Sequence, residues 1–168
     1  LIDPYYLSWK AREFDFHTQF IELAAETNEN MPFYVLGLIR RALSNVGVPF
    51  KDSNVLILGV AFKKDVDDTR ESPALKVMKF MMQRGVNNFS YNDPFVPSID
   101  VEGQNYESLD LTAENLSAAD VVVITTNHSA YDAEFIVKHA KAVVDTRNVT
   151  KDVADKDKIT KLGAGYLF

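Results

Sequence analysis

The sequence predicts an α/β fold, a Rossmann-like doubly wound parallel sheet preceded by a long helical arm. From residue 48 onward, short apolar runs alternate with helical segments, which is the pattern of a doubly wound sheet. Residues 55–58 and 121–124 are unbroken apolar runs, typical of parallel strands covered on both faces. Before residue 48 the chain has a helical pattern throughout.

Residues 1–47 are predicted to form a central helical segment that mediates dimerisation. A short amphipathic helix is expected over about residues 5–13 and a long one over about 18–46, with Gly47 as its stop. Apolar side chains in residues 33–46 occupy more than one helical stripe. A helix that is apolar on several faces is buried on several sides. We therefore expect a homodimer formed through the long helix.

Residues 48–168 are predicted to form the sheet domain. The Ser72-Pro73 pair begins one of its helices and Gly85 ends it, which is the usual asymmetry of helix termini. The expected strands are residues 54–60, 88–92, 121–126, 142–144 and 165–167, and the expected helices between them are residues 73–84, 113–118 and 133–140.

The composition excludes several function classes. A net charge of −6 argues against general nucleic-acid affinity. The sequence has no long apolar run and no signal-peptide pattern, so we expect a cytoplasmic protein without membrane contact. It contains no cysteine, so it offers no thiol nucleophile and no thiolate metal site. His17, His128 and His139 are scattered, and neither a metal site nor a catalytic triad is predicted from them.

A charged loop, GVAFKKDVDDTRESPAL, follows the first expected strand at residues 59–75. It lies between a strand and a helix N-terminus, where α/β folds bind phosphates, and its basic and hydroxyl side chains can meet an anion with several donors. The G-x-G-x-x-G fingerprint is absent, because no glycine follows Gly59 until Gly85. The sheet is therefore not expected to bind the pyrophosphate of NAD by itself.

This loop resembles the start of the C-terminal, UDP-binding domain of the UDP-glucose/GDP-mannose dehydrogenase family. The opening sequence, DPYYLSWKARE at residues 3–13, resembles the segment that follows the catalytic cysteine of that family. Two matches in the family's order are more specific than either alone. The resemblance covers nearly all of residues 3–150 and is closer to the UDP-N-acetylglucosamine 6-dehydrogenase branch than to the UDP-glucose branch.

The resemblance implies an NAD-dependent enzyme that oxidises the C6 alcohol of a UDP-sugar, here a UDP-N-acetylhexosamine, to the uronate for polysaccharide biosynthesis. In that family a cysteine thiolate traps the aldehyde covalently between two hydride transfers. The NAD-binding domain and the cysteine precede the segment matched here. We therefore expect the chain to be a C-terminal fragment that binds UDP-sugar and dimerises but is inactive as a dehydrogenase.

Three residues are assigned to substrate binding by the resemblance. Phe62 and Lys63 match the position where the family contacts the nucleotide sugar; a solvated lysine beside a core phenylalanine is the alternative. Arg147 matches the substrate-contacting arginine of the family's Asp-Gly-Arg-Asn element. In this chain Thr146 replaces the glycine of that element.

Two further residues are assigned to the chemistry. Asp3 matches an aspartate that assists the water hydrolysing the thioester, although it also suits a helix N-cap. Arg70 matches an arginine that reaches the NAD held by the other domain; a surface ion pair with Asp67 or Glu71 is the alternative.

Asp93 ends the second strand, where it suits a ribose-binding acid and a turn former equally.

A different class of function remains open. The same features suit a stand-alone nucleotide-binding or regulatory module with a helical dimerisation arm. A glycine-rich, cysteine-containing segment upstream of Leu1 would distinguish the dehydrogenase from such a module.

Overall fold

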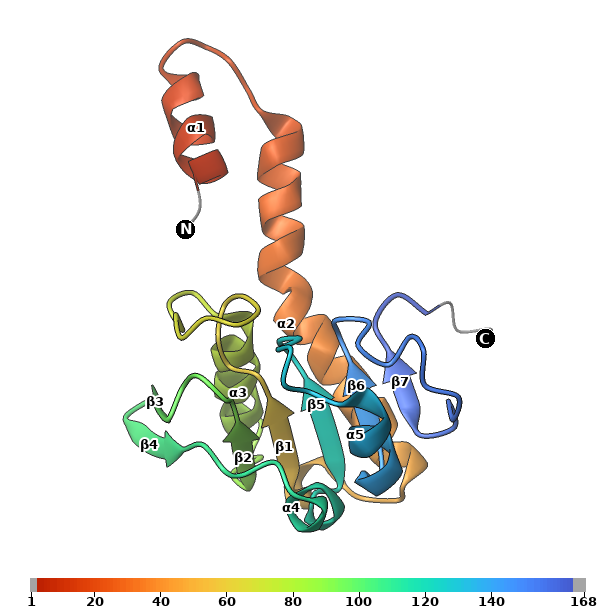
Figure 1. Ribbon diagram of the computed structural model, residues 1–168. Coiled ribbons are helices and arrows are strands. Elements are labelled where there is room, and N and C mark those ends of the chain that lie inside the picture. Colours follow the sequence, from red (N-terminus) through yellow and green to blue (C-terminus); the bar gives the residue numbers. More distant parts are fainter. Residues whose placement is uncertain (1–2, 165–168) are drawn as a thin grey trace.

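Five parallel strands form the central sheet, in the order β2-β1-β5-β6-β7 (Figure 1). The structure is a computed structural model that describes residues 3–164. The chain passes from β1 to β2 on one side and later returns to β5 on the other, so the strand order reverses between β1 and β5. The strands are β1 Val55–Leu58, β2 Phe89–Asn92, β5 Val121–Ile124, β6 Val143–Asp145 and β7 Ile159–Lys161.

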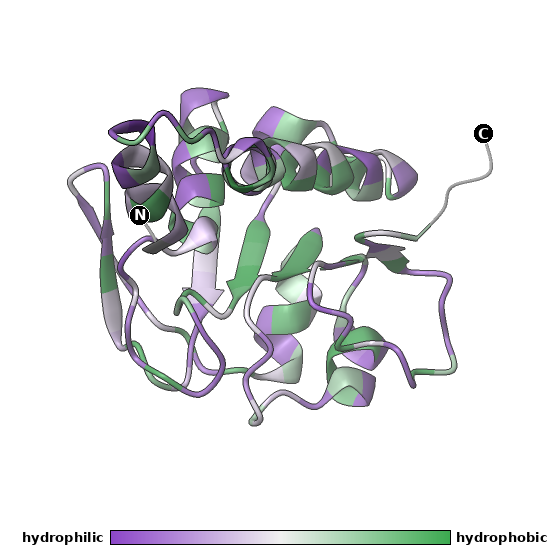
Figure 2. Ribbon diagram, turned by 90° about the horizontal axis from the view of Figure 1, so that it is seen from above, coloured by the Kyte–Doolittle hydropathy of each residue, from purple (hydrophilic) through white to green (hydrophobic). Residues whose placement is uncertain are grey.

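Helices cover both faces of this sheet, giving three layers (Figure 2). Successive side chains of a strand point to opposite faces. Ile57 therefore enters the core beneath α2 and α3, whereas Leu56 enters the core beneath α4 and α5. This explains the unbroken apolar runs and confirms the predicted fold class. The helices are α2 Gln19–Asn45, α3 Pro73–Gln83, α4 Ala113–Ala118 and α5 Ala133–His139.

The long helix α2 belongs partly to the sheet domain and partly to the arm. It continues through Pro32, and its second half lies on the sheet. Its first half extends beyond the sheet beside α1 (Asp3–Arg12), to which it is joined by an ion pair of 2.8 Å between Arg12 and Glu22 (Figure 1). The buried residues of α2 are Pro32, Val35, Leu36, Leu38, Ile39, Ala42 and Leu43.

This arrangement corrects one premise of the dimer expectation. Much of the apolar surface of residues 33–46 is covered by the chain's own sheet and not left for a second subunit. The large apolar side chains that stay exposed are mostly in α1, in the turn after it and in the first half of α2, where Phe20 is 89% exposed. None of the helices within residues 3–164 combines the length and apolarity needed to cross a membrane.

Three strands were not expected from the sequence. An antiparallel hairpin, β3 Ser98–Val101 and β4 Gln104–Glu107, follows β2. Its two-residue turn is Glu102-Gly103, both with positive φ, as a type I′ turn requires. Strand β7 also precedes the expected last strand at residues 165–167, which lies outside the described residues.

Candidate functional site

The carboxyl ends of the parallel strands bring the predicted loops to one edge of the sheet. The loop after β1 carries Phe62, Lys63 and Arg70, and the loop after β6 carries Arg147. The first half of α2 projects on this same side of the sheet (Figure 1). In open α/β sheets, ligands bind outside the carboxyl ends of the strands, where the strand order reverses. Here that point lies between β1 and β5.

The loops after β1 and β5 approach each other closely at this point. Gly59 has φ +83°, and a Cβ at Gly59 would lie 2.6 Å from the Cβ of Thr126. The hydroxyl of Thr126 donates a hydrogen bond of 2.6 Å to the carbonyl oxygen of Ala61. Glycine is therefore required by both the backbone conformation and the space available.

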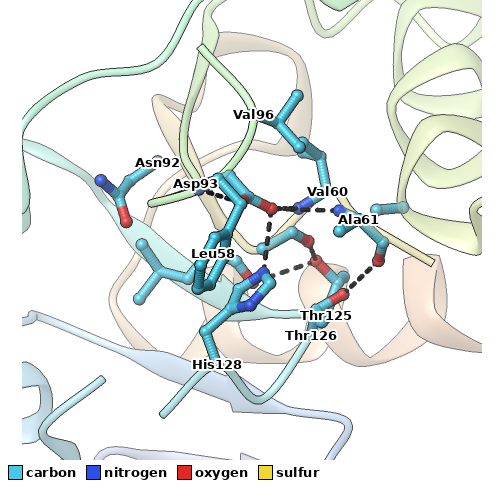
Figure 3. A network of polar contacts seen from close by, with 12 residues as sticks. Leu58, Val60, Ala61, Asn92, Asp93, Val96, Thr125, Thr126 and His128 are labelled. Carbon is cyan, nitrogen blue, oxygen red and sulfur yellow. Dashed lines mark hydrogen bonds and ion pairs between the residues drawn. The ribbon is translucent and has the colours of Figure 1, made fainter. Parts of the chain in front are cut away.

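Asp93, which follows β2, is the centre of a buried polar network (Figure 3). Its Oδ2 accepts hydrogen bonds from the backbone N–H groups of Val60, at 2.8 Å, and Ala61, at 3.0 Å. Its Oδ1 accepts from the N–H of Phe95 at 2.9 Å. The carboxylate faces the chain's own backbone, which fits the turn-forming interpretation and not the ribose-binding one.

The hydrogen bonds from Val60 and Ala61 to Asp93 also affect whether NAD can bind at the turn after β1. The backbone amides that follow the first strand are the groups that cradle the pyrophosphate in dinucleotide-binding folds. Here the N–H groups of Val60 and Ala61 already bind a carboxylate, whose charge repels phosphate. The turn after β1 therefore does not fit a dinucleotide.

His128 is buried and completes this network (Figure 3). Its Nδ1 accepts a hydrogen bond of 3.0 Å from the backbone N–H of Asp65, so Nδ1 carries no proton. The proton of the neutral ring is then on Nε2, which lies 3.0 Å from Oδ2 of Asp93 and donates to it. The rings of Phe95 and Tyr131 pack against the imidazole.

Sequence reasoning missed this role of His128. The sequence predicts neither a metal site nor a triad at His128, and the partners of its ring lie 35 and 63 positions away in the chain. No short-range spacing connects them. Within residues 3–164 the structure shows no group of three His, Cys, Asp or Glu side chains that could hold a metal ion.

Phe62 and Lys63 lie on a short exposed bend of the loop after β1. The N–H of Phe62 donates to the carbonyl oxygen of Asp68 at 2.7 Å, which closes the bend. Phe62 is 36% exposed and so is not a core residue, and the Lys63 ammonium lies 5.8 Å from the centroid of its ring. Asp65 accepts hydrogen bonds from the N–H and hydroxyl of Ser129, which lower the pKa of its carboxyl.

Arg147 lies on a loop whose backbone is hydrogen-bonded to a second buried carboxylate. Asp145, at the end of β6, is fully buried and accepts from the N–H of Arg147 at 2.9 Å and from the N–H and hydroxyl of Thr150. The side chain of Arg147 is exposed. Thr146, which replaces the family's glycine, has a negative φ and donates its hydroxyl to the carbonyl oxygen of Ile124. The local backbone therefore accommodates threonine.

Arg70 forms a bidentate ion pair with Asp68, a partner that was not among the two expected ones. Its Nε lies 2.9 Å from Oδ1 of Asp68 and its Nη2 lies 2.8 Å from Oδ2. These hydrogen bonds lower the pKa of the Asp68 carboxyl to about 2. The arginine is largely exposed, so the pair is accessible from solvent.

The arm and the loop after β1 together enclose a cleft of about 530 Å³. Of the predicted site residues, Phe62 and Arg70 line it. Asp3 begins α1, and its role stays a prediction. The arm contributes Tyr5, Ala25, Asn28, Glu29 and Pro32 to the cleft, and the sheet domain contributes Phe62, Asp68, Arg70, Glu71, Pro73 and Lys76.

The doubly wound sheet and the charged loops at its carboxyl edge define a Rossmann-like domain of the nucleotide-binding kind. Residues 56–152 match the family model for the UDP binding domain of the UDP-glucose/GDP-mannose dehydrogenase family. The chain belongs to this family, as the resemblance of its motifs predicted.

Several of the relatives that it matches are dehydrogenases of amino-sugar nucleotides. The UDP-N-acetyl-D-mannosamine dehydrogenase of Pyrococcus horikoshii is 34% identical in an alignment of 155 positions that covers 89% of this chain and 34% of the relative. The NDP-N-acetyl-D-galactosaminuronic acid dehydrogenase of Ralstonia nicotianae is 29% identical over 151 residues, 88% of this chain and 33% of the relative. The solved structure of the Pyrococcus enzyme has a TM-score of 0.69 at 29% identity and covers 84% of this chain and 32% of its own. The chain thus spans about a third of the length of these proteins.

The Arg70–Asp68 pair gives a test of this part of the site. In Arg70→Ala the pKa of Asp68 should rise from about 2 toward its ordinary value of 3.8, because the guanidinium donors are lost. Carbon-detected NMR titration of the aspartate carboxyls measures this shift. Arg40→Ala, which removes a guanidinium lying over the Phe50 ring, should leave Asp68 unchanged. An Asp68 that still titrates near 2 in Arg70→Ala would contradict the assignment.

Proposed function

We propose that this chain is the UDP-sugar-binding part of an NAD-dependent nucleotide-sugar 6-dehydrogenase. The whole enzyme would oxidise the C6 alcohol of a UDP-N-acetylhexosamine to the uronate. The family supports this proposal, as do relatives whose names specify N-acetylmannosamine and N-acetylgalactosaminuronic acid. The observation that carries it is the exposed Phe62-Lys63 pair, held at the carboxyl edge where the strand order reverses.

The side chains suit the parts of a UDP-sugar. The Lys63 ammonium neutralises a phosphate as a compact charge, and the fork of Arg147 binds phosphate or sugar oxygens in a bidentate manner. The exposed ring of Phe62 packs on a sugar or base face. Binding energy gathered on the nucleotide, far from C6, positions the reacting carbon against the hydride acceptor.

Arg70 is proposed to face the cofactor. NAD supplies the hydride acceptor, and the turn after β1 does not fit it, so another part of the longer enzyme must hold it. Arg70 is exposed at the cleft and bonded only to a solvent-accessible carboxylate among the contacts described above. A cofactor phosphate in the cleft would compete with Asp68 for the same guanidinium donors.

Substitution of Lys63 tests the binding proposal. Lys63→Ala should weaken the binding of UDP by roughly 1.5–3 kcal/mol, because a charge-assisted hydrogen bond is lost. Isothermal titration calorimetry measures the affinity. Lys79→Ala is the matched control, since Lys79 pairs with Glu102 on the hairpin. Absence of UDP binding to the unmodified chain at millimolar ligand would contradict the proposal.

Self-association through the arm is proposed as well. Two large apolar side chains at the start of α2, Phe20 and Leu23, are 89% and 60% exposed, and a second copy of the chain would cover them. The double substitution Phe20→Glu and Leu23→Glu should give a folded monomer in analytical ultracentrifugation. Leu36 and Ile39 are unsuitable for this test, because they lie in the core and their substitution would unfold the domain.

The double substitution Thr27→Glu and Asn30→Glu serves as the control for self-association, because it adds the same two negative charges at exposed polar positions of α2. It should leave the dimer intact. A monomer formed by the unmodified chain at high concentration would refute the proposed dimer.

The 168 residues alone are expected to have no dehydrogenase activity, because they contain no cysteine to trap the aldehyde. Incubation with NAD⁺ and UDP-N-acetylglucosamine, followed by NADH absorbance, measures this. A cysteine-containing N-terminal part should restore turnover. In the longer enzyme, Asp3→Asn should slow thioester hydrolysis more than the first hydride transfer.

Turnover by the 168-residue chain above a heat-killed control would refute this assignment. UDP binding without any restoration of activity would favour the stand-alone nucleotide-binding or regulatory module.

A further inference from the structure

The exposed segment Phe62–Lys64 is held from both of its ends. On one side, two hydrogen bonds fix Ala61. Its N–H donates to Oδ2 of Asp93, and its carbonyl oxygen accepts from the hydroxyl of Thr126. On the other side, Asp65 is fixed by its N–H bond to Nδ1 of His128. Only the three residues Phe62, Lys63 and Lys64 lie between these anchors.

His128 is in contact with both anchors. Its Nε2 donates to Oδ2 of Asp93, the same oxygen that holds the N–H groups of Val60 and Ala61. Its Nδ1 accepts from Asp65. The side chain is fully buried, so water does not compete for either nitrogen.

The backbone of Asp65 needs such support. Its φ of 58° lies in the left-handed region, which aspartate tolerates better than most residues but which still costs free energy relative to glycine. A non-glycine residue persists there only where its surroundings over-determine it. The hydrogen bonds to His128 and Ser129 do so here.

We propose that His128 is a positioning residue for the nucleotide-binding loop. As the neutral tautomer with its proton on Nε2, it accepts from Asp65 and donates to Asp93, and so holds Phe62–Lys64 in a single backbone conformation. Its consequence for affinity rests on the proposed function: a loop ordered before binding loses less entropy when the ligand arrives, so UDP-sugars bind more tightly.

The first test uses the unmodified chain. NMR of the imidazole nitrogens should show one of the three histidines with a protonated Nε2 and an unprotonated, hydrogen-bonded Nδ1. The Asp65 amide should exchange slowly with solvent although its segment is exposed. A proton on Nδ1 of His128 in the folded protein would overturn the proposal, and this result does not depend on any variant folding.

Two substitutions then separate the two hydrogen bonds. In His128→Asn the amide oxygen falls near the position of Nδ1 and can still accept from Asp65, while the donor to Asp93 is lost. In His128→Gln the amide nitrogen falls near Nε2 and can still donate to Asp93, while the acceptor for Asp65 is lost. Both variants remove the imidazole ring, so both lose its packing against Phe95 and Tyr131.

We expect His128→Gln to weaken UDP-N-acetylglucosamine binding about tenfold, since one buried anchor is lost. The Asp65 amide should exchange faster in that variant. His128→Asn should weaken binding less than His128→Gln does, because Asp93 still accepts from the N–H groups of Val60, Ala61 and Phe95. His139→Gln is the control, because His139 contacts Phe135 on α5 and should change nothing.

Equal weakening in both His128 variants, or a protected Asp65 amide in His128→Gln, would overturn the proposal. If the unmodified chain binds no UDP-sugar, the proposed function fails. In that case the exchange of the Asp65 amide in the two variants still decides whether His128 positions the loop.

Discussion

The buried carboxylate of Asp93 is the constraint on which the carboxyl edge of this sheet depends. A charge removed from water must be surrounded by hydrogen-bond donors, because burying it unpaired costs far more than a fold of this size can offset. Here the donors are the N–H groups of Val60, Ala61 and Phe95, together with the Nε2–H of His128. The chain after β1 is therefore turned inward at Val60 and Ala61 before it bends out again at Phe62. Asp145 has the same effect on the loop after β6, because its buried carboxylate accepts hydrogen bonds from the backbone N–H groups of Arg147 and Thr150.

This arrangement changes what the edge can offer to an anion. In a dinucleotide-binding turn the backbone amides face the ligand, whereas here a carboxylate of the protein occupies them. The groups left for a ligand are exposed side chains on loops whose backbones are already fixed, among them Lys63 and Arg147, which we propose for this role. Side-chain recognition of this kind does not require a glycine-rich turn, and it is compatible with Thr146 in place of a glycine. It explains how one fold class can serve a nucleotide sugar with a sequence that lacks the dinucleotide fingerprint.

The sequence predicted those features that local patterns determine. Unbroken apolar runs identified β1 and β5, and the Ser72-Pro73 pair identified the start of α3, whose N-cap hydroxyl accepts from Ala74. The hairpin was missed because its Glu102-Gly103 turn is not one of the strong hairpin dipeptides. The network of His128 could not be predicted, since it depends on which distant loops the topology brings together. The apolar faces of α2 were recognised, but periodicity does not reveal whether a sheet of the same chain or a second chain covers each face.

The arm and the site are coupled through the cleft that they share. Tyr5 and Asn28 from the arm line the same space as Phe62 and Arg70 from the loop after β1. The second half of α2 is fixed in the core by residues such as Ile39, which is fully buried, so the helix cannot tilt without disturbing the sheet. Its first half inherits that orientation and carries one wall of the cleft. A partner that covered the exposed apolar side chains of the arm would therefore contact a helix whose orientation the sheet domain already sets. The proposed association through the arm and the proposed ligand binding at the cleft would then share one rigid helix, α2, as a common wall.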